Sequence, residues 1–70
     1  MYELTYKNKN IEEYLLFSSI FNAMRYAKDK YNIQLFKKEN KKLVYRENNI
    51  VCAIARIDIP NDLNIFIQHK

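Results

Sequence analysis

The stretch NIVCAIARIDIP, residues 49–60, decides how this chain folds. Between Ile50 and Ile59 both alternating sets of residues are mostly apolar, which predicts a β-strand covered on two faces. One set has no polar member, and its two alanines would let a helix approach closely; it comprises Val51, Ala53, Ala55, Ile57 and Ile59. The other set is assigned to the opposite face and comprises Ile50, Cys52, Ile54, Arg56 and Asp58.

Asparagine marks the turns around this strand, because the chain of 70 residues contains no glycine. Asn is the residue other than Gly that best tolerates the left-handed backbone that turns require. The segments between these asparagines predict strands at residues 2–7, 32–38, 41–47, 49–59 and 62–68. The links between the last four are short, so these strands are expected to pair antiparallel.

One helix is predicted after the first strand, with Asn10 as its N-cap and Asn32 as its left-handed C-terminal residue. Its acidic start, at Glu12 and Glu13, favours the positive end of the helix dipole. At helical spacing the segment presents one apolar stripe, made of Leu16, Phe17, Ile20, Phe21, Ala23, Met24, Ala27 and Tyr31. The expected fold is a single α+β domain, residues 1–70, with one helix on one face of a four- to five-stranded antiparallel sheet in the order β-α-β-β-β-β.

The sheet face away from the helix is the predicted interaction surface. It combines an apolar centre with a polar rim, a pattern typical of surfaces that bind other proteins. The predicted partner-binding residues are Phe36, Val44, Arg46, Ile50, Ile54, Arg56 and Phe66. The simpler alternative is an ordinary surface, since more than half of the exposed area of most proteins is apolar.

A nucleic-acid interface is the rival hypothesis, suggested by a net charge of +4 and a pI near 9.3. Its candidate residues are Lys37, Lys38, Lys41, Lys42, Arg46 and Arg56. Two plainer explanations compete with it. Lysines commonly protect the edge of a sheet, and Lys, Asn, Ile, Tyr and Phe, all encoded by AT-rich codons, make up more than half of the chain.

Catalytic, metal and cofactor chemistry have no support in the sequence. His69 is the only histidine and Cys52 the only cysteine, so neither a catalytic triad nor a set of metal ligands can be assembled. No glycine-rich loop is available to hold phosphate. No apolar run approaches the length of a bilayer span and no signal peptide is evident, so a cytoplasmic protein that contacts no membrane is expected.

The expected function is therefore that of a small, non-enzymatic protein-binding module. Its composition resembles that of small phage and mobile-element proteins from AT-rich bacteria, and this resemblance implies an inhibitor that occludes a host protein surface. Self-association of two copies through the same sheet face, as a homodimer, is the variant of this hypothesis. A small basic nucleic-acid-binding protein is the alternative.

Overall fold

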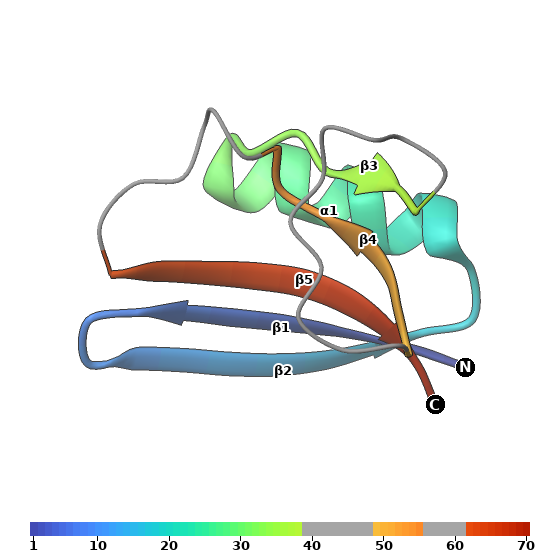
Figure 1. Cartoon of the computed structure of the whole chain (residues 1–70), viewed down its shortest axis with the longest axis horizontal. Coiled ribbons are helices and arrows are strands. Elements are labelled where there is room, and N and C mark those ends of the chain that lie inside the picture. Colours follow the sequence, from blue (N-terminus) through green and yellow to red (C-terminus); the bar gives the residue numbers. More distant parts are fainter. Residues whose placement is uncertain (39–48, 56–61) are drawn as a thin grey trace.

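The computed structural model describes residues 1–38, 49–55 and 62–70. Their elements are β1 (Tyr2–Asn8), β2 (Ile11–Phe17), α1 (Ile20–Tyr31), β3 (Phe36–Lys37), β4 (Ile50–Ala53) and β5 (Leu63–His69). All neighbouring strands pair antiparallel, in the spatial order β2-β1-β5-β4-β3 (Figure 1). The predicted α+β class, one helix against a five-stranded antiparallel sheet, is confirmed.

A β-hairpin occupies the segment that was expected to begin the helix. Residues 11–17 form β2, which pairs with β1 at seven consecutive positions, from Tyr2 opposite Phe17 to Asn8 opposite Ile11. Lys9, in the two-residue turn, takes up a left-handed backbone with φ of 57°. The helical assignment of this segment was wrong because its apolar residues fit either period. Pairing with β1 along seven residues gives the segment a ladder of backbone hydrogen bonds on one side, whereas the first turn of a helix leaves its N–H groups without partners.

The helix is therefore shorter than predicted and begins at Ile20. Its N-cap is Ser19, whose Oγ accepts hydrogen bonds from the backbone N–H groups of Phe21 at 3.1 Å and Asn22 at 3.5 Å. No acidic residue lies in the first turn, so the predicted dipole role of Glu12 and Glu13 was also wrong. The other end is confirmed: Asn32 is the left-handed cap, with φ of 57°, after basic residues in the last turn.

β4, which lies within the strand predicted at residues 49–59, changes face at a β-bulge. In β4, Ile50 lies opposite Gln68 but Cys52 lies opposite Ile67, which shows a register shift between the two. A bulge adds one residue to one strand and so exchanges the faces of everything that follows. Cys52 and Ile54 consequently belong to the core beneath the helix. Ala53 lies opposite Phe66, so the assignments of Cys52, Ile54 and Ala53 to faces were wrong.

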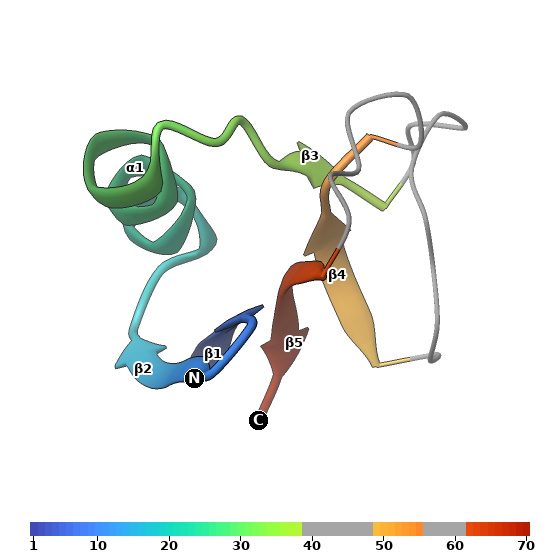
Figure 2. The ribbon, with the colours of Figure 1, turned by 90° about the vertical axis from the view of Figure 1, so that its left-hand side faces the viewer.

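The core lies between the sheet and a layer formed by α1 and the segment that follows it. Figure 2 shows α1 over the β2–β1 side of the sheet, with residues 32–35 crossing towards β3. The core cluster consists of Leu4, Ala23, Ala27, Leu35, Cys52, Ile54, Leu63, Ile65 and Ile67. The two buried alanines of α1 allow the close approach to the sheet that small side chains permit.

Two predicted features lie outside the described residues: the strand at 41–47, and the end of the strand at 49–59 with Ile57 and Ile59. Within the described residues, no helix has the length and apolar character needed to cross a membrane.

Candidate protein-interaction face

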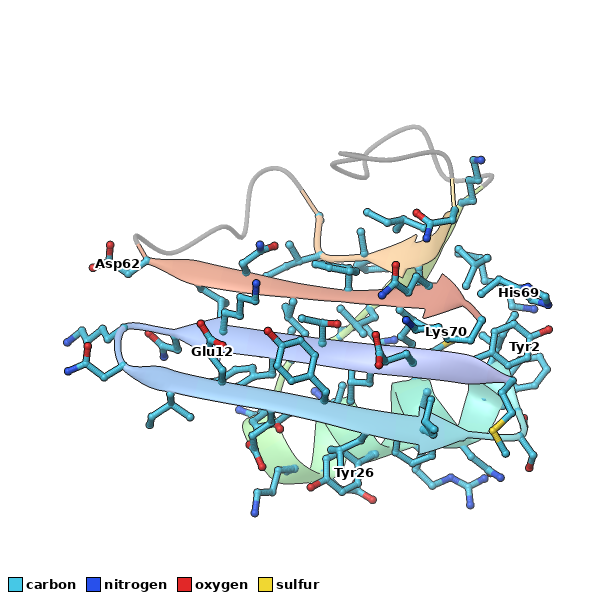
Figure 3. The ribbon with its side chains drawn as sticks, turned by 90° about the horizontal axis from the view of Figure 1, so that it is seen from below. Tyr2, Glu12, Tyr26, Asp62, His69 and Lys70 are labelled. Carbon is cyan, nitrogen blue, oxygen red and sulfur yellow. The ribbon has the colours of Figure 1, made fainter. Side chains whose placement is uncertain are left out.

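The sheet face away from α1, called here the open face, carries one row of residues that runs across all five strands. Directly opposed pairs link Tyr14 to Thr5, Thr5 to Phe66, Phe66 to Ala53, and Ala53 to Phe36. We call these five residues the central row. Because directly opposed residues share a face, large aromatic and small side chains alternate along it. Figure 3 looks onto the open face, with α1 behind the sheet.

In the central row, small buried residues separate the larger and more exposed aromatic residues. Thr5 and Ala53 are each 2% exposed, whereas Phe66 and Phe36 are half-buried and Tyr14 is exposed. Since neighbouring strands lie about 4.8 Å apart, the backbones of successive aromatic residues in the central row are separated by about 10 Å. The Oγ1 of Thr5 is buried without a hydrogen-bond partner among the described residues.

Tyr14 is the most exposed member of the central row, with 52% of its surface accessible. Its hydroxyl donates a hydrogen bond to Oε2 of Glu12 at 3.2 Å. Nζ of Lys7 lies 5.8 Å from the centre of its ring, within cation–π range. The exposed tyrosine is therefore held from two sides before any partner arrives, which lowers the entropy lost when it is buried.

A polar network closes one end of the open face. The Nδ2 of Asn49 donates to Oε1 of Gln68, and Nε2 of Gln68 donates to Oε1 of Glu3, both at 2.8 Å. Nζ of Lys70 lies 3.5 Å from the same Glu3 oxygen. These contacts join β5 to β1 and leave a satisfied polar rim beside the aromatic centre, as protein interfaces have.

The charges of the open face are balanced on β1, β2 and the end of β5. Two carboxylates, Glu3 and Glu12, are matched by two ammonium groups, Lys7 and Lys70. Each cation has an acidic neighbour: Lys70 contacts Glu3, and Lys7 lies directly opposite Glu12. A phosphate backbone needs a run of cations to replace its counterions. Over these strands the open face offers no such run.

The predicted partner-binding residues fall into three groups. Phe36 and Phe66 belong to the central row, and Ile50 lies on the same face, opposite Gln68 and almost fully buried. Ile54 lies in the core cluster and is 8% exposed, so its prediction as a contact residue was wrong; the bulge in β4 is the reason. The remaining three, Val44, Arg46 and Arg56, lie outside the described residues.

The predicted lysine cluster is only partly described. Lys37 lies opposite Cys52, on the helix side of the sheet, and its Nζ is 4.2 Å from the centre of the Phe21 ring. Lys38 is exposed. Lys41 and Lys42 lie outside the described residues, as do the two arginines of the nucleic-acid hypothesis. Lys37 therefore lies on the opposite side of the sheet from the central row.

Sequence reasoning missed the contribution of β2 to the open face. Tyr14 and Leu16 are exposed there, at 52% and 59%, but were counted within the predicted helix. Two signals could have found the strand. Asn10 and the adjacent Lys9 form a two-residue link between segments of equal length, and the Ser18–Ser19 pair precedes the true helix start.

On the helix side, β2 is linked to α1 by Tyr31, which is half-buried. The hydroxyl of Tyr31 donates to Oε1 of Glu13 at 2.6 Å, and its ring stacks on that of Tyr6 with centres 3.9 Å apart. Burial, and next the hydrogen bond to the Glu13 carboxylate, raises the pKa of Tyr31 above its ordinary value of 10.0. Tyr26 packs beside it, between Tyr31 and Phe17.

Other site chemistry receives no support from the described part of the chain. No group of three or more His, Cys, Asp or Glu side chains that could hold a metal ion occurs among those residues. His69 makes an edge-to-face contact with Tyr2, with ring centres 5.3 Å apart. Comparison with protein-family models, with curated proteins and with solved structures yields no match to this chain.

Proposed function

We propose that this chain is a protein-binding module that uses its open face to occlude a surface of a partner protein. The observation that carries the proposal is the central row, in which exposed and half-buried aromatic residues alternate with small ones across the whole sheet. Aromatic side chains dominate the binding energy of protein interfaces, especially near their centre. Tyr14 has the position and exposure of such an anchor, and Lys7 and Glu12 orient it.

The balance of charge supports a protein partner over nucleic acid. An interface centre is depleted of unpaired charge. Over β1, β2 and the end of β5, the open face carries two carboxylates and two ammonium groups, so that its charges cancel. Stacking platforms for single-stranded bases also use aromatic residues, but they combine them with a positively charged groove. The nucleic-acid alternative therefore depends on residues beyond those described.

The test is affinity capture from the cells that produce the chain, with three tagged forms compared by quantitative mass spectrometry. Phe66→Thr removes the middle aromatic residue of the central row and keeps a residue that favours strands. Phe21→Thr is the matched control, because Phe21 is 62% exposed on α1, on the other side of the sheet. A partner retained by the wild type and the control, and reduced at least about tenfold by Phe66→Thr, is expected.

Two results would contradict this function. One is a captured protein that Phe66→Thr retains as well as the wild type does, once circular dichroism has shown that the variant is folded. The other comes from a labelled oligothymidylate probe: binding at low salt that falls steeply as salt rises would favour the nucleic-acid alternative.

A further inference from the structure

The edge strand β2 has an outer side that no described strand pairs with. It forms one of the two edges of the described sheet, and it pairs with β1 over its full seven residues without a bulge. Its outer edge therefore presents a straight row of backbone N–H and C=O groups, which is a template for another strand. The sequence IEEYLLF contains no lysine or proline, and its only charges are those of Glu12 and Glu13.

We infer that β2 pairs antiparallel with β2 of a second copy of this chain, about a two-fold axis at Tyr14, so that the two described sheets join into one continuous sheet. A second copy fits because this register aligns the strand with itself over its whole length and sets no like charges opposite each other. Glu12 then faces Leu16 of the other copy, Glu13 faces Leu15, and Ile11 faces Phe17. All seven residues are paired and no carboxylate opposes another.

Neighbouring registers are worse for identifiable reasons. In any acceptable register, the numbers of two paired residues add up to an even number. With an odd sum, the two open faces would lie on opposite sides of the joined sheet. The axis one residue earlier, at Glu13, would place two carboxylates directly opposite each other, which is destabilising. The axis one residue later, at Leu15, would leave Ile11 without a partner within β2.

The two-fold register also covers the exposed apolar residues of β2. Ile11, 58% exposed, lies on the helix side at the far end of the strand from Phe17. Pairing places it beside Phe17 of the second copy, whose ring already contacts Tyr26 at 5.5 Å between centres. Figure 3 shows Tyr26 projecting past β2 on the side away from β1, where the second strand would lie. On the open face, the two Tyr14 residues meet at the axis.

The helices are compatible with this arrangement. α1 packs on both β1 and β2, so its axis lies inside the edge of the sheet. With strands about 4.8 Å apart, the two helices would lie about 10 Å from each other, which is a normal packing distance. The inference does not depend on the proposed function, but it would join two central rows into one.

The first test is the oligomeric state of the full chain by sedimentation velocity over a range of concentrations. Tyr14→Lys places two like charges at the axis and is expected to raise the dimer dissociation constant at least about tenfold. Phe21→Lys makes the same change of charge at an equally exposed position away from β2 and is expected to leave association unchanged. A wild-type chain that stays monomeric at about 1 mM overturns the inference, as does a dimer that Tyr14→Lys does not weaken.

The register is tested separately with a short bismaleimide crosslinker. Tyr14→Cys brings two thiols together at the axis, whereas two copies of Glu12→Cys lie about 13 Å apart along the strands. Rapid crosslinking of Tyr14→Cys alone is expected, with the wild type as the background because Cys52 is buried. Equal crosslinking of both variants, or preference for Glu12→Cys, overturns the two-fold register. Phe66→Thr, which tests the proposed function, leaves this edge intact, so the two proposals can fail independently.

Discussion

The two edges of the described sheet differ in length, regularity and protection. The β2 edge is seven residues long, pairs without interruption and has no lysine or proline. The β3 edge comprises two residues, Phe36 and Lys37, pairs with a bulged strand and is followed by Lys38. Short length, bulges and lysine are the features by which proteins prevent one sheet from joining another. Among the described strands, β3 therefore has the features of a protected edge, whereas β2 is long and regular enough to pair with another strand.

The largest effect expected on stability comes from the core beneath the β1–β2 ladder. Leu4 is fully buried on β1, while Leu16 is exposed on the edge strand itself. Leu4→Ala is expected to lower the free energy of unfolding by about 3 kcal/mol, since it leaves a cavity. Leu16→Ala is expected to change it by less than about 0.5 kcal/mol. Urea denaturation at low protein concentration measures both. Similar losses would mean that the β2 edge is part of the core and is not a free edge.

A smaller effect is expected where β2 is tied to the helix. Tyr31→Phe removes the hydroxyl that donates to Glu13 and is expected to cost about 1–2 kcal/mol, because the hydrogen bond has a charged acceptor. Tyr26→Phe is the matched control. The Tyr26 ring packs against Phe17 and Tyr31, but its hydroxyl makes no hydrogen bond among the described residues. If both substitutions lower the free energy of unfolding equally, the hydrogen bond from Tyr31 to Glu13 does not stabilise the edge strand.

The same contact predicts a pH dependence. The pKa of Tyr31 is raised on folding, so its contribution to stability is fully present below the unfolded value of about 10 and is lost as pH rises above it. The wild type is therefore expected to lose more stability than Tyr31→Phe between pH 9 and pH 11, a range set by the tyrosine value. Denaturation at both values measures the difference; an equal loss in the two proteins would contradict it.

The smallest effect is expected to be a gain, at the centre of the open face. Thr5→Val replaces a buried hydroxyl that lacks a described partner with a methyl group of similar shape. Stability is expected to rise by about 1 kcal/mol, because an unsatisfied polar group no longer has to be buried. Thr5 is central on β1, so the gain should leave the edge behaviour of β2 unchanged by sedimentation. A loss of stability would show that the hydroxyl is satisfied in solution.

Much of the fold could be predicted from local patterns. The alternation of β1 and β5 identified the residues that face the helix, as Leu4 and Ile65 show. Asn32 ended the helix where a residue that tolerates left-handed backbone was expected. The candidate face was found through Phe36, Ile50 and Phe66, which do share one side of the sheet.

The errors arose where a long-range contact overrode a local pattern. Residues 11–17 fit a helical stripe, but the ladder with β1 makes them a strand and exposes Leu16. Ile54 fits the open face by counting alternate residues, but the bulge in β4 turns it into the core. The alternation of apolar and polar residues cannot predict either the ladder or the bulge.

Local sequence patterns were enough to predict the class of the protein: one helix that ends at Asn32, antiparallel strands, and a sheet face with Phe36 and Phe66. Asparagine was not the general turn residue, because Lys9 and Asp62 hold the other left-handed positions among the described residues. The correctly predicted features depend on neighbours along the chain, where side-chain period and backbone preference act directly. Three features became clear only from the folded chain: residues 11–17 form a strand, this strand is an edge, and Tyr14 joins the central row. Those features depend on which strands lie side by side, and strand pairing is set by packing among residues far apart in the chain.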